Sequence, residues 1–432
     1  MSPACSQGSD REHSKTFRAA LWRTEARAPV QGKWLFLCAF IFACFLFWWL
    51  RSVLCRVVFY LPDSVDDSTI GISVLALVLF VAGYLIPTID RSPPRIPEAM
   101  LDACGDFAYK TTVTVFLLAL PIAALVWYSR LGKGYFGVII PFFDQAVLYT
   151  HLFFGFICLG AADPGRDGWK RIWTVSILLT LPRLIISLNG GRFFLAQAVV
   201  PALLIAVARG WIRPSFKRML QIAALALVII FVPAMTRGDE LVGPDHDLLI
   251  FMSSDVLGLF QNNTDLSLNG NCPPLLISLT AKVIPYGAMG VCVVDTAGLK
   301  NVPATLEHIL TNNEPGSFSG TAAGTGSNYL LELYLSGGLL AVYIGSALFG
   351  FSCRCFLCWI GRRSLFSGIW AECLTRALFA PRGNLGYVYE RIPSLVVATL
   401  LLVLIVWAWR LLKRELLSQS TADNRTLDGE AR

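Results

Sequence analysis

Residues 324–338 read GTGSNYLLELYLSGG, and within them a polar stretch of glycine, serine and threonine gives way to an apolar segment that carries one carboxylate, Glu332. The apolar residues continue well beyond Gly338, which predicts that the chain enters a membrane helix here. An ionisable side chain at the mouth of such a helix costs free energy unless a partner or a ligand uses it. Glu332 is therefore the first residue to test for a functional role.

The composition is typical of polytopic membrane proteins, because 55% of the 432 residues are hydrophobic and only 15% are charged. A membrane-spanning helix needs roughly 17 to 25 predominantly apolar residues, and the sequence contains about ten such runs. They lie at 34–50, 70–89, 111–128, 139–160, 172–188, 193–208, 219–235, 328–352, 364–380 and 393–412. We therefore expect an all-α fold, a polytopic membrane helix bundle of about ten transmembrane helices with one large external loop.

The distribution of lysine and arginine predicts the orientation of the chain, because basic residues gather on cytoplasmic segments. The bias places both termini in the cytoplasm, and the net charge of +7 then reflects topology and indicates no nucleic-acid partner. The first apolar run is too long and too far along the chain for a cleavable signal peptide, so none is expected. The expected regions are a basic cytoplasmic tail (1–33), transmembrane helices 1–7 (34–235), a large periplasmic loop with short interfacial helices (236–327), transmembrane helices 8–10 (328–412) and a second cytoplasmic tail (413–432).

The large loop is longer than ordinary connections, and loops of that length are usually functional or disordered. Its apolar segments 248–260 and 275–285 are too short to span a bilayer. They are consistent with interfacial or re-entrant helices that cover a cavity, and equally with two helices of a small packed cap.

Nucleotide-driven chemistry is not expected, because the sequence has no glycine-rich phosphate loop with its lysine. Cys353, Cys355 and Cys358 lie close together, but no fourth metal ligand is near them in the sequence. We therefore expect no metal and no cofactor.

Three polar residues at the end of the large loop fall on one helix face. Asn328, Glu332 and Ser336 are spaced four residues apart, so a helix would present an amide, a carboxylate and a hydroxyl together. Glu332 could then accept a proton from a bound hydroxyl group. The alternative is a structural carboxylate paired with a neighbouring arginine. Gly337, Gly338, Gly345 and Gly350, further along, are expected to allow close contact between helices.

Six arginines lie near the external ends of the predicted spans, where the positive-inside tendency makes them unusual. Guanidinium groups bind phosphate oxygens with two parallel hydrogen bonds and remain charged at physiological pH. Together they predict a pyrophosphate-binding vestibule, although each taken singly could be an interface residue with its charge in water. These arginines are Arg183, Arg192, Arg237, Arg376, Arg382 and Arg391.

Asp144 and His151 lie two helical turns apart and should face the same way. They could relay a proton, but a hydrogen-bonded pair inside the bundle is the favoured interpretation.

Residues 326–338, GSNYLLELYLSGG, resemble a glycine- and serine-rich stretch with a Glu-Tyr element in the bacterial oligosaccharide repeat-unit polymerases, the O-antigen polymerase or Wzy family. The predicted topology and the arginines at the turns of Arg192 and Arg382 are also similar to that family. The arginine-to-glycine spacing of some members is absent after Arg192, Arg237 and Arg382.

The resemblance implies a membrane glycosyltransferase of the bacterial inner membrane that works without a metal. Such an enzyme transfers a glycan from undecaprenyl pyrophosphate to the terminal hydroxyl of another lipid-linked repeat at the periplasmic face. The implied partners are the lipid-linked oligosaccharide, the lipid bilayer and a chain-length regulator. Glu332 would be the base, and the arginines with Asn328 and Ser336 would bind substrate.

Three alternatives remain open from the sequence. An O-antigen ligase is expected to carry a histidine late in its external loop, where this chain has Glu332, with His308 earlier. A transporter or flippase would use the same charged residues as a pathway, although paired broken helices are its usual sign. A scaffold for polysaccharide assembly would need no chemistry.

Overall fold

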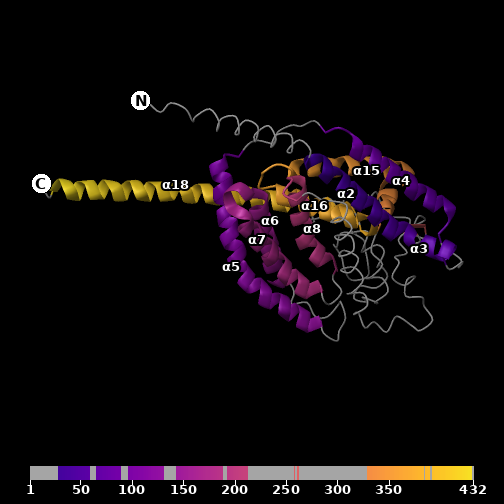
Figure 1. Ribbon diagram of the computed structural model, residues 1–432, viewed down its shortest axis with the longest axis horizontal. Coiled ribbons are helices and arrows are strands. Elements are labelled where there is room, and N and C mark those ends of the chain that lie inside the picture. The colour runs from indigo at the N-terminus through magenta and orange to yellow at the C-terminus, as the bar shows by residue number, and fades with distance from the viewer. Residues whose placement is uncertain are drawn as a thin grey trace, which may run out of the picture. The chain divides into compact units, whose positions relative to one another are not determined.

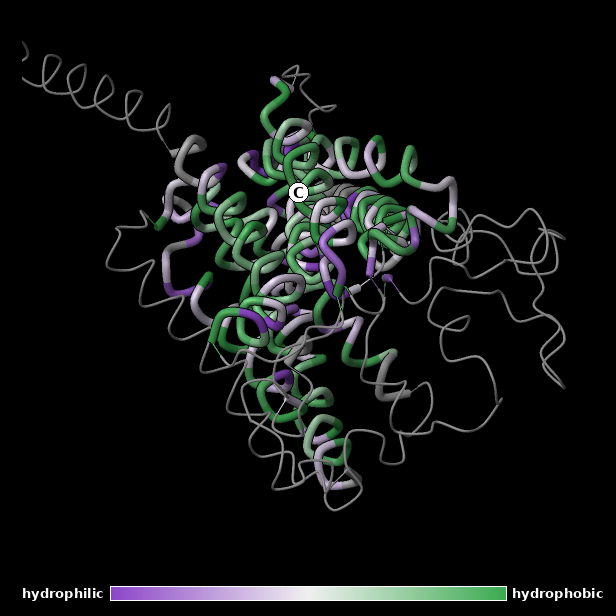
Figure 2. Tube along the Cα trace, turned by 90° about the vertical axis from the view of Figure 1, so that its right-hand side faces the viewer, coloured by the Kyte–Doolittle hydropathy of each residue, from purple (hydrophilic) through white to green (hydrophobic). Residues whose placement is uncertain are grey.

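The computed structural model describes residues 28–58, 65–88, 96–130, 143–187, 192–212, 257, 260–261, 328–383, 385–389 and 392–430. Every regular element in these residues is helical, which confirms the predicted all-α class (Figure 1). Five of these helices are long and apolar enough to cross a bilayer: Gly32–Val58, Asp67–Leu85, Glu98–Tyr128, Tyr329–Ile360 and Ile392–Lys413. The protein is thus a multi-pass membrane protein, while the total of about ten spans remains a prediction. Hydrophobic residues predominate along the helices (Figure 2).

The chain divides into two compact units, and each is described by itself. The first contains Met1–Thr88, Val200–Arg362 and Trp370–Glu390. The second contains Ile89–Val199, Arg363–Ile369 and Arg391–Arg432.

The described part of the first unit begins with one long apolar segment that alternates between α-helix and π-helix. It consists of α2 (Ala28–Cys44), η1 (Phe45–Trp49), α3 (Leu50–Val53) and η2 (Leu54–Val58), where η1 and η2 are π-helical turns. Such turns are rare and are often found at functional sites. The predicted span 34–50 is therefore shorter than the observed helical segment.

The helix α4 (Asp67–Leu85) packs closely along α15 (Tyr329–Ile360). A Cβ atom added at Gly83 would lie 1.9 Å from the carbonyl oxygen of Ala347. One added at Gly350 would lie 2.0 Å from the carbonyl oxygen of Phe80. Glycine at both positions lets the two backbones touch, as is common in membrane helix pairs. The close contact predicted at Gly350 is confirmed.

The span expected at 328–352 is not a straight helix. Gly337 and Gly338 interrupt α15, and Gly338 has φ 65° and ψ −160°, a conformation available almost only to glycine. The Tyr329 and Phe349 rings are 5.5 Å apart, although twenty residues of straight helix would separate them by roughly 30 Å. Residues 329–336 therefore fold back along residues 339–360, and the latter alone, roughly 33 Å long, are able to cross the membrane.

Short helical elements complete the first unit. They are α16 (Ser367–Phe379), whose first residues belong to the second unit, η3 (Ala380–Arg382), a single 3₁₀ turn, and α17 (Leu385–Tyr389). The helix α16 lies within the predicted span 364–380 but has only 13 residues and is not among the five helices long and apolar enough to cross a bilayer. It ends at η3, where Pro381 cannot continue an α-helix.

The second unit is built around α5 (Glu98–Arg130), which packs against α6 (Phe143–Ala161) and α7 (Pro164–Ser187) (Figure 1). The helix α8 (Arg192–Ala208) begins in this unit and ends in the first. The last helix, α18 (Ile392–Glu430), contacts α5.

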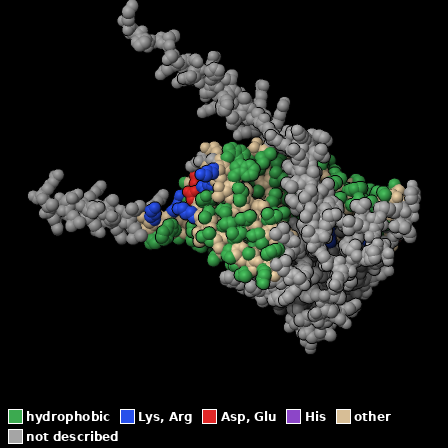
Figure 3. Space-filling model, turned by 60° about the horizontal axis from the view of Figure 1, so that its bottom comes forward, with side chains coloured by type: hydrophobic (Ala, Val, Ile, Leu, Met, Phe, Trp, Pro, Cys, Tyr) green, Lys and Arg blue, Asp and Glu red, His purple; other side chains and the backbone are tan. Residues whose placement is uncertain are grey.

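Two helices of the second unit are longer than the apolar runs from which they were predicted. The helix α5 begins at Glu98 instead of at residue 111, and α18 continues to Glu430 instead of ending near residue 412. In the added part of α5, Asp102 and Asp106 have basic partners, so their charges do not prevent a helix from continuing beyond the apolar run. Hydrophobic side chains cover much of the described face in Figure 3, and charged ones gather at its end near α18.

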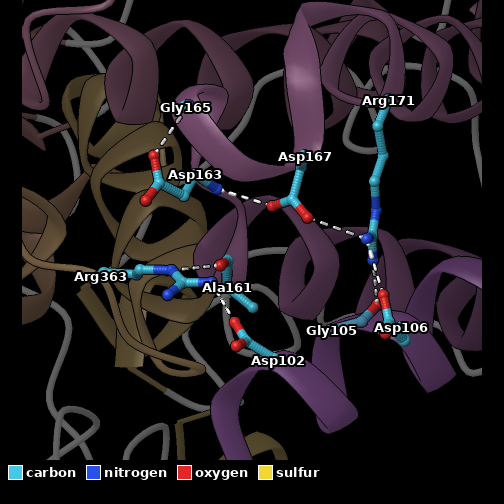
Figure 4. A network of polar contacts seen from close by, with 9 residues as sticks. All are labelled: Asp102, Gly105, Asp106, Ala161, Asp163, Gly165, Asp167, Arg171 and Arg363. Atoms are coloured by element: carbon cyan, nitrogen blue, oxygen red, sulfur yellow. Dashed lines mark hydrogen bonds and ion pairs between the residues drawn. The ribbon is translucent and has the colours of Figure 1, made fainter. Parts of the chain in front are cut away.

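An ion network joins the helix ends of the second unit (Figure 4). Arg171 lies 2.7 Å from Asp106 and 3.0 Å from Asp167, measured between nitrogen and oxygen. Arg363 lies 2.5 Å from Asp102. The network ties the first turns of α5 and α7 to the segment at Arg363.

Candidate functional site

Glu332 lies within the short helical stretch 329–336, just before the bend at Gly337 and Gly338. Asn328 caps this stretch, because its side-chain oxygen accepts the backbone N–H of Leu330 at 2.8 Å. Glu332 is completely buried. Its carboxylate therefore faces the interior of the first unit and does not face lipid.

Backbone N–H groups hold one oxygen of this carboxylate. Oε2 of Glu332 accepts the N–H of Leu385 at 2.5 Å and that of Gly386 at 3.4 Å. These donors belong to the first turn of α17, where N–H groups have no partner within the helix and attract negative charge. Glu332 thus connects the folded-back part of α15 to α17, 53 residues later in the chain.

Ser336 lies on the same short helix as Glu332, as predicted, whereas Asn328 has an extended backbone and precedes the helix as its N-cap. The Ser336 hydroxyl donates to the carbonyl oxygen of Glu332 at 2.6 Å, while the Asn328 side chain caps the helix. Both side chains therefore support the local backbone around Glu332.

The first π-helical turn, η1, forms one wall of this region. The indole Nε1–H of Trp48 donates to the carbonyl oxygen of Pro381 at 2.8 Å, and the Trp48 ring lies 5.6 Å from that of Tyr329. The Arg382 guanidinium carbon lies 5.9 Å from the centre of the Phe47 ring. The structure thus brings Glu332 and Arg382 into one assembly made of η1, the start of α15, η3 and α17.

Arg376 is held in an ion pair on its own helix. Its Nη2 and Nε lie 2.9 and 3.1 Å from Oε1 of Glu372, one helical turn earlier, and only 1% of Arg376 is exposed. The arginine-held structural carboxylate that the sequence offered as an alternative for Glu332 is thus found at Glu372.

Arg183 and Arg192 belong to the second unit. Arg183 is buried, donates to the carbonyl oxygen of Leu148 at 3.2 Å and lies 5.5 Å from the centre of the Tyr149 ring. Arg192 is the first residue of α8, and its side chain lies outside the described residues. Arg237 and Arg391 also lie outside them.

Asp144 and His151 both lie on α6, as expected, and His151 is buried beside the Phe116 ring at 6.0 Å. The side chain of Asp144 lies outside the described residues, so their pairing remains a prediction.

Part of the large loop contacts the region around Glu332. The Phe260 ring lies 5.6 Å from the Tyr334 ring, two residues after Glu332, and Gln261 accepts the backbone N–H of Asp66 at 2.8 Å. Phe260 is buried by this packing. These contacts are consistent with the predicted cover, although the rest of loop 236–327 lies outside the described residues.

Sequence reasoning missed several residues of this assembly. Trp48, Leu385 and Tyr389 are far from Glu332 in the chain, and each resembles an ordinary apolar or aromatic residue of a membrane helix. Only Pro381 gave a local signal, since it ends α16 and places η3 beside η1.

Comparison with known protein families matches residues 306–415 to the model of the O-antigen polysaccharide polymerase Wzy. The match covers about a quarter of the chain and includes the bend, Glu332, Arg376, Arg382 and α17. No curated protein and no solved structure matches the chain. Residues 306–415 thus match the Wzy family of O-antigen polysaccharide polymerases, which confirms the resemblance that the sequence around Glu332 predicted.

Proposed function

We propose that this protein polymerises lipid-linked oligosaccharide repeat units at the periplasmic face of the bacterial inner membrane. It transfers a glycan from undecaprenyl pyrophosphate to the terminal sugar hydroxyl of a second lipid-linked repeat. The observation that supports this proposal most strongly is the buried Glu332, in a fold-back helix within the residues matched to Wzy.

Glu332 is the proposed general base. The acceptor hydroxyl oxygen forms a bond to the anomeric carbon, the bond from that carbon to the pyrophosphate oxygen breaks, and the hydroxyl proton passes to Glu332. The lipid pyrophosphate leaves with the electron pair of the broken bond. The backbone N–H groups of Leu385 and Gly386 hold Oε2 of Glu332 in place for this step.

Arginines would stabilise the negative charge that develops on the leaving pyrophosphate. Arg382 is the best-supported candidate, because it shares an assembly with Glu332. Arg376 is less suited, since Glu372 already binds its guanidinium. Arg183, Arg192, Arg237 and Arg391 remain candidates as proposed from the sequence, with Asn328 and Ser336 in supporting roles.

The test replaces the chromosomal gene with a Glu332→Gln variant and analyses the surface glycan by gel electrophoresis. The amide keeps an oxygen to accept the Leu385 N–H but cannot act as a base, so single lipid-linked repeats should accumulate without long chains. Glu98→Gln, at an exposed glutamate of the second unit, is the matched control and should make normal chains. Long chains in the Glu332→Gln strain at equal protein level would refute the proposal.

The same experiment separates the alternatives. A ligase would leave long chains on the lipid carrier without attachment to a lipid A core. A transporter would leave no repeats outside the inner membrane, and a scaffold would be unaffected by the change from carboxylate to amide.

A further inference from the structure

The folded-back helix 329–336 is fixed on one side by a contact between a leucine and a glycine. Leu333 fills the space that the missing side chain of Gly345 leaves on the other arm of α15. A Cβ atom at Gly345 would lie 2.5 and 2.9 Å from the two methyl carbons of Leu333 and 3.2 Å from its Cγ. Because Leu333 directly follows Glu332, this contact fixes the backbone that carries the carboxylate.

The bend at Gly337 and Gly338 makes the contact between Leu333 and Gly345 possible. Gly338 adopts φ 65°, which a residue with a side chain rarely adopts, and the chain reverses direction there. The pairs Tyr329–Phe349 and Leu333–Gly345 show that the two arms of α15 run side by side on either side of the bend.

The short helix α17 is fixed to the same arm of α15 at its other end. The hydroxyl groups of Tyr389 and Ser352 lie 2.5 Å apart, and the Tyr389 ring is 6.4 Å from that of Phe349. Ser352 lies two helical turns beyond Gly345 on α15. The short helix that carries Glu332 and the helix α17 that supplies its N–H donors are thus each held by a separate contact with residues 339–360.

We infer that Leu333, Gly345, Ser352 and Tyr389 are positioning residues for Glu332. They touch no reacting atom in this arrangement and act by holding the carboxylate and α17 in register. The inference rests on the proposed function, in which Glu332 accepts the proton of the acceptor hydroxyl.

The first test is a compensating pair of substitutions. Gly345→Ala places a methyl group against Leu333 and should lower kcat about tenfold, because a shift of about 1 Å in a catalytic group can cost up to about 100-fold. KM for the lipid-linked repeat should stay unchanged, since the binding residues do not move. The change Leu333→Ala removes the three carbons that would collide, so the double variant should be faster than Gly345→Ala alone.

The assay uses membrane vesicles that contain each variant, supplied with lipid-linked repeats extracted from the host at saturating and limiting concentrations. A double variant that is no faster than Gly345→Ala would overturn the inference. So would a Gly345→Ala variant whose only defect is a reduced amount of folded protein.

The second test removes one hydroxyl group without changing packing. Tyr389→Phe and Ser352→Ala should each lower kcat about fivefold. The double variant should be no slower than either single variant, because both substitutions remove the same hydrogen bond. Tyr84→Phe is the matched control, because it removes a similar hydrogen bond in the same unit, from the Tyr84 hydroxyl to the Lys33 carbonyl at 2.7 Å, that does not involve α17. Equal kcat values for Tyr389→Phe, Tyr84→Phe and the unmodified protein would overturn the role of Tyr389 and Ser352.

The two proposals fail in different ways. Polymerisation by Glu332→Gln would overturn both. An inactive Glu332→Gln, together with additive losses at Gly345 and Leu333 and full activity of Tyr389→Phe, would overturn the positioning role and leave the proposed function standing.

Discussion

Carboxylates are held in two different ways in the two units of this protein. In the first unit, Oε2 of the buried Glu332 accepts backbone N–H groups of α17. In the second, Asp102 and Asp106 are ion-paired with Arg363 and Arg171, and the network lies partly open at helix ends (Figure 4). Backbone N–H donors carry no net charge, whereas protonation of Asp102 or Asp106 in the second unit would break an ion pair. The first arrangement suits chemistry, and the second suits stability.

The strongest test of this difference between the two units is to neutralise one carboxylate in each of them. Glu332→Gln should lower the polymerisation rate by about 100-fold or more, the usual effect of losing a general base, with little change in folded protein. Asp106→Asn should leave the rate per folded molecule unchanged. Rates measured in vesicles, normalised to folded protein, check both outcomes, and equal losses of rate in the two variants would remove the distinction.

The next largest effect is expected where α4 and α15 touch, because this contact supports the frame of the Glu332 region. Gly350→Ala would place a Cβ atom 2.0 Å from the Phe80 carbonyl oxygen, so the helices must separate, at a cost of about 2 kcal/mol or more. Thermal unfolding of the protein in detergent measures the loss. Gly71→Ala on α4 is the control, since a Cβ there meets nothing within 4 Å, and an equal loss at Gly71 would contradict the packing argument.

A smaller effect is expected in the second unit when its ion network is opened. Arg363→Ala removes the partner of Asp102 and should lower the free energy of unfolding by about 1 to 2 kcal/mol, with an unchanged rate per folded molecule. Lys110→Ala, at an exposed residue of α5, should have no effect in the same unfolding experiment. A specific loss of rate in Arg363→Ala would show that this region serves the reaction as well.

The smallest effect concerns the first turn of α4. Asp66 accepts the Thr69 N–H at 2.6 Å, and hydrogen bonds from Thr69 hold the pKa of the Asp66 carboxyl below its ordinary value. The ionised cap therefore stabilises the fold fully above the ordinary pKa, and this contribution is lost as the pH falls through the lowered value. Asp66→Ala should cost about 1 kcal/mol at neutral pH and less in acid.

Unfolding curves at several pH values measure this difference. Asp66→Asn keeps an oxygen to cap the helix and should lose less stability than Asp66→Ala at neutral pH, with a weaker dependence on pH. A stability loss in Asp66→Ala that is the same at every pH would exclude a contribution from the charge.

The sequence predicted the helices better than it predicted their ends. Apolar runs identified α4 and α8 closely, because burial in lipid requires apolar side chains. The start of α5 at Glu98 was missed because Asp102 and Asp106 interrupt the apolar pattern, and their partners Arg363 and Arg171 lie far away in the chain. Periodicity alone cannot show that a charged residue has a partner.

The candidate site was predicted only in part, because some of its contacts join residues that lie far apart in the chain. The shared helix of Glu332 and Ser336 follows from local spacing, and the structure has it, while Asn328 caps that helix instead of lying on it. The glycines at 337 and 338 were interpreted as packing positions, although they form a bend, because two adjacent glycines fit either role. The contact of Glu332 with Leu385 could not be predicted, since nothing near either residue in the sequence identifies the other.

The bend in α15 also has a consequence for competing hydrolysis. Leu333 lies beside Gly345, seven residues beyond Gly338, which places the proposed base roughly 10 Å along the helix axis from the reversal. Glu332 is completely buried, so a transfer reaction at this carboxylate would occur where bulk water is scarce, and an acceptor sugar delivered by its own lipid would meet the activated glycan in preference to water. Chain extension would then be favoured over wasteful loss of the donor.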